Sequence, residues 1–194
     1  MVKAVIFDFF GVLALRGAAS FRKVHLADDP DKNAQAEQLS DELGRGNIGY
    51  NDFVDGLARL GGVSREKVLE YTEDYRPNTE LLNYIRGSLK PSYKIGIISN
   101  AGEDWVLKIL GADNLKLFDD IVLSYKVSSI KPEPEIYGLS ANNLGVKAPE
   151  CVFIDDIERY CQGAEQIGMN SIWYKDFKGF KTELEKILAA GSDN

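Results

Sequence analysis

Acidic side chains stand at the ends of short apolar runs in this 194-residue chain. Asp8 follows the run at residues 2–7, and Asp155 and Asp156 follow the run at residues 152–154. A carboxylate can attack an electrophile and form an acyl-phosphate or ester intermediate. Several carboxylates together offer the hard oxygen ligands that Mg²⁺ prefers. These residue types therefore indicate nucleophilic chemistry beside a divalent cation.

Hydroxyl, amide and ammonium groups follow two further apolar runs. Ser99 and Asn100 come directly after residues 95–98, and Lys131 follows residues 121–123 after a short loop. The Ser99 hydroxyl and the backbone N–H groups after it can hold phosphate oxygens, and Lys131 supplies a compact positive charge. A dianionic phosphate beside three carboxylates would be repelled without a metal and a lysine, so the groups depend on one another.

The apolar runs predict the elements that position these groups. The runs lie at residues 2–7, 95–98, 121–123, 152–154 and 172–174, and each is nearly continuous, as in strands covered on both faces. Helical patterns separate them, so we predict an α/β fold with a doubly wound parallel sheet. Ligands bind beyond the carboxyl ends of strands in such sheets. The polar residues should therefore converge on one cleft.

Residues 14–76 break this alternation and show amphipathic patterns without a convincing strand. We predict a helical cap at 14–76, inserted into a core formed by residues 1–13 and 77–194. One helical pattern includes Val68, Tyr71 and Tyr75, and the polar segment 27–32 is expected to separate helices. Pro77 suits a helix start at the return to the core. The lone histidine, His25, is expected on a solvated basic face.

Composition narrows the class of partner. The net charge is −7 and the pI is about 4.9, which argues against a nucleic-acid footprint. No 18 uncharged apolar residues run together, so no membrane span is expected. Cys151 and Cys161 have no metal or redox spacing and indicate reduced, structural thiols. The N-terminal run contains Asp8 and fits a buried strand better than a signal peptide, so a cytoplasmic protein is expected.

Four segments, in order, resemble the motifs of the haloacid dehalogenase (HAD) superfamily. They are Phe7-Asp8-Phe9-Phe10-Gly11-Val12-Leu13, Ile97-Ile98-Ser99-Asn100-Ala101, Lys131-Pro132-Glu133-Pro134 and Phe153-Ile154-Asp155-Asp156. The resemblance implies a Rossmann-like core with an inserted helical cap. It also implies Asp8 as nucleophile, Ser99 as phosphate donor beside Asn100, Lys131 as charge stabiliser and Asp155 as Mg²⁺ ligand. Asp156 and the Phe10 carbonyl are further candidate ligands.

Phe10 is the one departure in the first motif. Phosphatases of the superfamily usually carry there a second aspartate that acts as general acid and base, a role worth about 10²–10⁴ in rate. We predict a Mg²⁺-dependent phosphatase acting on a small phosphorylated metabolite, similar to sugar-1-phosphate phosphatases and the epoxide hydrolase phosphatase domain. Without an acid at Phe10, substrates with good leaving groups should be favoured.

Two alternatives remain open from the sequence. The site resembles that of 2-haloacid dehalogenases in carrying an aromatic residue at Phe10, but those enzymes need no metal and lack the acidic pair of the fourth motif. The other alternative is a degenerate site on a binding or regulatory protein. Arg159 and Tyr160 favour it, because amide or acidic residues are common at their positions in the superfamily.

Overall fold

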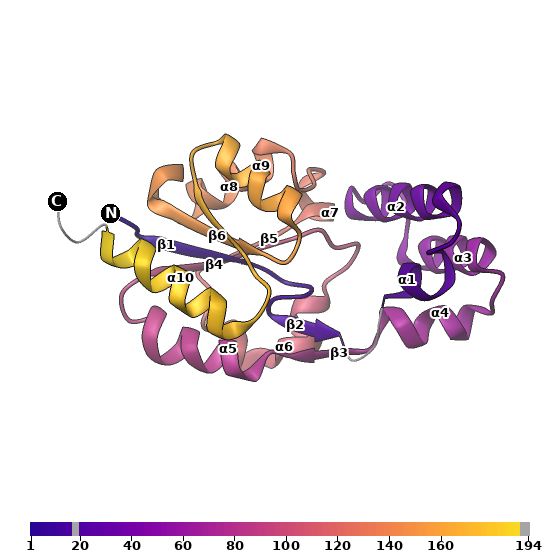
Figure 1. Cartoon of the computed structure of the whole chain (residues 1–194), viewed down its shortest axis with the longest axis horizontal. Coiled ribbons are helices and arrows are strands. Elements are labelled where there is room, and N and C mark those ends of the chain that lie inside the picture. The colour runs from indigo at the N-terminus through magenta and orange to yellow at the C-terminus, as the bar shows by residue number, and fades with distance from the viewer. Residues whose placement is uncertain (17–19, 191–194) are drawn as a thin grey trace.

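A five-stranded parallel sheet forms the centre of the molecule. The computed structural model describes residues 1–16 and 20–190. The strand order is β5-β4-β1-β6-β7 (Figure 1). The strands are β1 Ala4–Asp8, β4 Lys94–Ser99, β5 Asp120–Leu123, β6 Cys151–Asp155 and β7 Asn170–Trp173. Each predicted apolar run overlaps one of these strands, which confirms the predicted α/β fold class.

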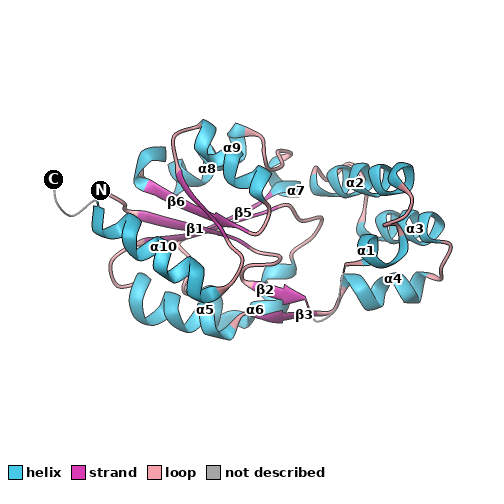
Figure 2. Cartoon of the chain, viewed as in Figure 1, coloured by secondary structure: helices cyan, strands magenta, loops and turns pink. Residues whose placement is uncertain are grey.

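Helices cover both faces of this sheet, which explains why its strands are apolar without alternation. In β1, Val5 and Phe7 belong to one core, and Ala4 and Ile6 belong to the other. The first core is covered by α5 Thr79–Tyr84, the π-helix η1 Ile85–Leu89, α6 Trp105–Leu115 and α10 Phe177–Ala190. The second is covered by α8 Pro134–Asn143 and α9 Glu158–Gln166, on the opposite side in Figure 2. The short helices α7 Ser124–Val127 and η2 Ala148–Glu150 complete this region.

Between β2 and β3, the described residues form four helices that have a core of their own. They are α1 Phe21–His25, α2 Pro30–Gly44, α3 Tyr50–Gly61 and α4 Arg65–Thr72. The buried apolar residues of this core are Phe21, Leu26, Ala36, Val54, Leu57 and Val68. Figure 1 shows the group beside the carboxyl ends of the sheet strands, on the right of the view. The division into a core of residues 1–13 and 77–194 and a cap of residues 14–76 stays a prediction.

A two-stranded antiparallel ribbon connects these helices to the sheet, and the sequence did not predict it. It pairs β2 Ala14–Arg16 with β3 Tyr75–Pro77. Strands of three residues are too short to show a hydrophobic period. The assignment of Tyr75 to a helical face was therefore wrong, because α4 ends at Thr72. Pro77 ends β3 instead of starting a helix, and the Asn78 side chain caps α5.

The polar segment at residues 27–32 separates α1 from α2, as expected, and the second helix begins inside it. Asp29 is the N-cap of α2, and its side chain accepts a hydrogen bond of 3.0 Å from the Lys32 N–H. Pro30 occupies the first turn, where its missing N–H costs nothing. Asp29-Pro30 is thus a helix-start signal within the segment that separates the two helices.

Two smaller expectations concern the cysteines and a membrane span. Cys151 and Cys161 are buried free thiols, as predicted. Among the described residues, none of the helices combines the length and hydrophobicity that a membrane crossing requires.

Candidate active site

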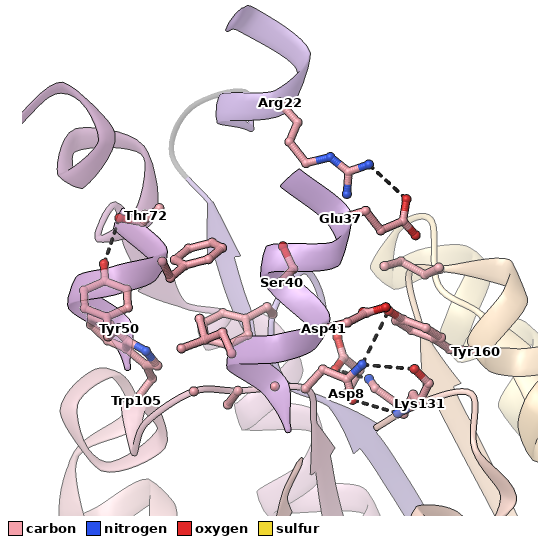
Figure 3. Close-up of a pocket in the computed structure, with 18 of the residues that line it drawn as sticks. Asp8, Arg22, Glu37, Ser40, Asp41, Tyr50, Thr72, Trp105, Lys131 and Tyr160 are labelled. Atoms are coloured by element: carbon pink, nitrogen blue, oxygen red, sulfur yellow. Dashed lines mark hydrogen bonds and ion pairs between the residues drawn. The ribbon is translucent and has the colours of Figure 1, made fainter. Parts of the chain in front are cut away.

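Lys131 lies between two carboxylates at the carboxyl ends of neighbouring strands. Its Nζ is 2.5 Å from Asp8 Oδ1 and 2.6 Å from Asp155 Oδ2. Asp8 ends β1 and Asp155 ends β6, and these strands are paired, so the fold itself brings the carboxylates together. The Lys131 and Asp155 side chains are 1% and 0% exposed. Figure 3 shows Lys131 and Asp8 at the base of the pocket.

Burial and mutual charge control the ionisation of this cluster. Burial raises the pKa of Asp8 well above its ordinary value, the Asp155 carboxylate raises it further, and Lys131 opposes both effects. Burial alone would lower the pKa of Lys131, but the Asp155 and Asp8 carboxylates hold it above its ordinary value. The ammonium group therefore stays charged and offsets the two carboxylates.

Asp156 completes a set of three carboxylates. Single ligand oxygens of Asp8, Asp155 and Asp156 all lie within 4.8 Å of one another. Desolvation at the cleft raises the pKa of Asp156 to about 6, and the Asp155 carboxylate contributes. Asp155 Oδ1 also accepts a hydrogen bond of 2.8 Å from the Ile157 N–H, which fixes this carboxylate in the turn that precedes α9.

Gly11 makes room for the Asp156 carboxylate. Its φ of +98° is in the region that favours glycine. A Cβ atom at Gly11 would overlap the Asp156 carboxylate. The glycine of the first motif is therefore required both by its backbone conformation and by the acidic group packed against it.

Ser99 and Asn100 lie at the carboxyl end of β4 with different environments. Ser99 Oγ is buried and has no hydrogen-bond partner among the described residues. Asn100 is engaged with the main chain of Lys131: its Oδ1 accepts from the Lys131 N–H at 2.8 Å, and its Nδ2 donates to the Lys131 carbonyl at 3.1 Å. The geometry thus leaves Ser99 free for a ligand, while the Asn100 side chain positions Lys131.

Phe10 packs its ring within the candidate site. The ring centroid is 4.7 Å from that of Tyr75 and 4.9 Å from that of Phe9. Arg16 donates a hydrogen bond to the Tyr75 hydroxyl, which fixes this aromatic pair at the ribbon. Within the described residues, no backbone hydrogen bond reaches the Phe10 carbonyl, so its lone pairs stay available.

A cavity of about 310 Å³ opens above Asp8 and Lys131. One side is aromatic and is formed by Phe10, Tyr50, Phe53, Tyr75 and Trp105. The other side is polar and is formed by Arg22, Glu37, Ser40, Asp41 and Arg159. Figure 3 shows Tyr50 and Trp105 across from Glu37 and Tyr160. The cavity can therefore hold an organic group attached to a phosphate at its base.

Most of the polar side comes from residues that sequence reasoning missed. Glu37 on α2 accepts a hydrogen bond of 2.5 Å from Arg159 and one of 3.2 Å from Arg22. Of these residues, only Arg159 stands out in the sequence, as an unusual residue after the fourth motif. No local pattern identifies Arg22, Glu37 and Asp41, because their common cavity depends on how the helices pack. The period of α2 would have shown that residues 37 and 41 share a face.

His25 is not on a solvated face, so that prediction was wrong. Its ring stacks on Phe21 with centroids 4.7 Å apart and meets Tyr71 edge-on at 5.3 Å. Its Nε2 is buried and unpartnered among the described residues. The imidazole therefore packs against the aromatic side chains of the four helices.

The similarity to known proteins agrees with this geometry. Residues 2–168 match the haloacid dehalogenase-like hydrolase family. The D-ribitol-5-phosphate phosphatase of Bacteroides thetaiotaomicron is 26% identical over 207 residues, which cover 97% of this chain and 99% of that protein. The protein YhcW of Bacillus subtilis (strain 168) is 35% identical over 187 residues, which cover 89% of this chain and 83% of that protein.

A solved structure shares both fold and family. It is a HAD family enzyme of Bacteroides thetaiotaomicron in complex with magnesium and inorganic phosphate. It superposes with a TM-score of 0.70 at 25% identity, covering 90% of this chain and 95% of that chain. The chain therefore belongs to the haloacid dehalogenase-like hydrolases, as its four motifs predicted. It is a hydrolase by family.

Proposed function

We propose that this protein is a Mg²⁺-dependent phosphatase that hydrolyses a small phosphate monoester through a phosphorylated Asp8. The observation that carries the proposal is the buried contact of Lys131 with Asp8 and Asp155 beside the unpartnered Ser99 hydroxyl. Relatives named or crystallised with phosphate chemistry support the class of reaction. The core of residues 1–13 and 77–194 would supply this chemistry, and the cap of residues 14–76 would cover it.

Asp8 would act as the nucleophile. Its Oδ1 is held by Lys131, and no hydrogen bond among the described residues engages its Oδ2. This oxygen would attack phosphorus, the bond from phosphorus to the substrate oxygen would break, and the aspartyl-phosphate would then be hydrolysed by water. Ser99 Oγ would donate to a phosphate oxygen, and Lys131 would stabilise the negative charge of the transferring group.

The residues present fit a magnesium ion. Asp8, Asp155 and Asp156 gather three hard oxygen ligands, and the Phe10 carbonyl is available beside them. Bound there, Mg²⁺ would neutralise part of the phosphate charge that the carboxylates would otherwise repel. The solved relative in complex with magnesium and inorganic phosphate supports this assignment.

The test is an activity screen with an aryl phosphate and a panel of sugar and polyol phosphates, with and without Mg²⁺. We expect turnover that requires the metal and falls by at least about 10³-fold in Asp8→Asn, because removal of a nucleophile removes the covalent route. Halide release from a 2-haloacid without metal would instead show a dehalogenase. Silence toward both substrate classes, with a folded protein, would show a degenerate site.

A further inference from the structure

The proposed reaction needs a proton that Phe10 cannot supply. When the substrate oxygen leaves phosphorus it carries negative charge, and a simple alkoxide is a poor leaving group unless it is protonated. Two residues after the proposed nucleophile, where an aspartate would protonate this oxygen, the chain has Phe10, which packs on Tyr75. Turnover of a substrate with a poor leaving group would therefore need a proton donor from elsewhere in the cavity.

The last turn of α2 is docked onto the loops that carry the phosphate site. The Leu43 side chain packs directly against Gly102, just beyond Ser99 and Asn100. A Cβ atom on Gly102 would overlap the Leu43 side chain. A Cβ on Gly44 would be 3.2 Å from Ile130, the residue before Lys131. Arg45 at the end of the helix pairs with Glu133. This turn is thus fixed over the reacting centre by three successive residues.

Asp41 belongs to the same turn and lines the same cavity as Asp8 and Lys131. It is half-buried, and no hydrogen bond or ion pair engages its carboxylate among residues 1–16 and 20–190. The charged groups facing it are Arg159 on α9, Glu37 and Arg45 on α2 or its C-cap, and Glu133 at the start of α8. Both arginines are already paired, Arg159 with Glu37 and Arg45 with Glu133.

This environment favours the protonated form of Asp41. Burial raises the pKa of its carboxyl group, and the Glu37 and Glu133 carboxylates add to the effect against Arg159 and Arg45. The other acidic groups are less suited. Glu37 is held by two arginines, which keep its pKa below its ordinary value, and Asp8 is held by Lys131.

We propose that Asp41 of the cap is the general acid and base of this enzyme, in place of the aspartate absent at Phe10. The inference rests on the proposed phosphatase function. In the first step Asp8 bonds to phosphorus, the bond to the substrate oxygen breaks, and that oxygen takes the proton of the Asp41 carboxyl group. In the second step Asp41 takes a proton from the attacking water, whose oxygen bonds to phosphorus while the bond to Asp8 breaks. The products are an alcohol and inorganic phosphate, and Asp41 is protonated again.

Asp41→Asn tests this assignment, with Glu42→Gln as the matched control. Glu42 is the next residue of α2, but its side chain accepts from Asn47 and lies outside the cavity. For alkyl phosphates we expect kcat/KM to fall by about 10²–10⁴-fold in Asp41→Asn and to change little in Glu42→Gln. For p-nitrophenyl phosphate, whose leaving group needs no proton, kcat/KM should be retained.

Two further readouts separate proton transfer from a structural role. With p-nitrophenyl phosphate, Asp41→Asn should release one burst of nitrophenolate per active site and then turn over slowly, because water attack lacks its base. In the wild-type protein, kcat/KM for an alkyl phosphate should fall as the pH rises through the pKa of Asp41, since the acid form is required. That fall should be absent for the aryl substrate. The pH comparison uses the wild type alone and holds even if the variant folds poorly.

The outcomes distinguish the two proposals. Metal-dependent turnover with the same leaving-group dependence in wild type and Asp41→Asn, and no burst, would overturn the role of Asp41 and leave the phosphatase intact. A wild-type protein without turnover on any phosphate ester would overturn both. A steep leaving-group dependence that appears only in Asp41→Asn would support both.

Discussion

Arg159, in the first turn of α9, donates a hydrogen bond of 2.5 Å to Glu37 on α2. This ion pair connects the helices between β2 and β3 to the side of the sheet that carries Asp155. It adds a polar contact to the approach of Leu43 to Gly102 and of Gly44 to Ile130. The polar side of the cavity is therefore bordered by a charge pair that joins α2 to α9.

Glu37→Gln should loosen this closure. Because both side chains are partly exposed, we expect a loss of only about 0–1 kcal/mol in the free energy of unfolding, together with faster hydrogen exchange in α2 and a higher KM. Glu70→Gln is the control, since Glu70 pairs with Lys67 inside α4 and connects nothing else. Equal exchange rates in α2 of wild type and Glu37→Gln would show that the pair does not hold the cap.

The same pair has a defined pH dependence. Arg159 lowers the pKa of Glu37 in the folded protein. A carboxylate with a lowered folded pKa stabilises the native state above its unfolded pKa and loses that contribution as the pH falls through the folded pKa. The α2 exchange rate should therefore approach that of Glu37→Gln on acidification below the ordinary glutamate range. A difference that persists at low pH would contradict this origin.

Lys131→Met should destabilise the metal-free protein by about 3–5 kcal/mol, because it leaves two buried carboxylates without their cation. Lys126→Met is the control: Lys126 pairs with Asp104 at 3.1 Å where both side chains are about half exposed, and its loss should cost about 0–1 kcal/mol. Urea denaturation measures both. Equal losses would mean that the buried cluster contributes no more than a surface pair.

Gly11→Ala should destabilise the protein by about 1–3 kcal/mol, because its φ is +98° and the new methyl group would displace the Asp156 carboxylate. Gly138→Ala, inside α8 with open space around the new methyl group, should instead stabilise it by about 0.4–1 kcal/mol. Thermal unfolding compares the two variants. A neutral Gly11→Ala would show that Asp156 and the backbone can move apart freely.

Asp156→Asn should weaken Mg²⁺ binding by at least about tenfold, the smaller end of what is lost when groups around a metal are removed. Calorimetric titration measures it directly, and Trp173 offers an optical reporter because its Nε1 donates to the Asp156 carbonyl at 3.0 Å. Asp176→Asn is the control, since Asp176 caps α10 through the Gly179 N–H outside the candidate site. Unchanged affinity in Asp156→Asn would remove Asp156 from the proposed ligands.

The parallel sheet, and the edge of it where polar residues end the strands, were predictable from the sequence because both depend on strong local patterns. Residues such as Asp8 and Asp155 follow apolar runs long enough to define strands, and paired parallel strands carry their ends to one edge. The ribbon of β2 and β3 was not predictable, because three residues show no period. Its Arg16–Tyr75 contact joins positions 59 residues apart.

The polar side of the cavity was beyond the sequence for a different reason. Asp41 and Glu37 appear on an unremarkable polar helix, and their position over Lys131 depends on the docking of α2. The environment of His25 likewise depends on Phe21 and Tyr71 packing around it. Local sequence indicates which groups can react, whereas the helix packing decides which of them meet.

Phosphorylation of Asp8 itself is the most direct test of the central claim. Wild-type protein is mixed with Mg²⁺ and a phosphate monoester, quenched with acid during turnover, treated with borohydride to convert an acyl phosphate to homoserine, and digested for mass spectrometry. We predict homoserine at position 8 in the wild type and at no position in Asp8→Asn, which should also be inactive. Modification of a different carboxylate, or full turnover by Asp8→Asn, would contradict the account.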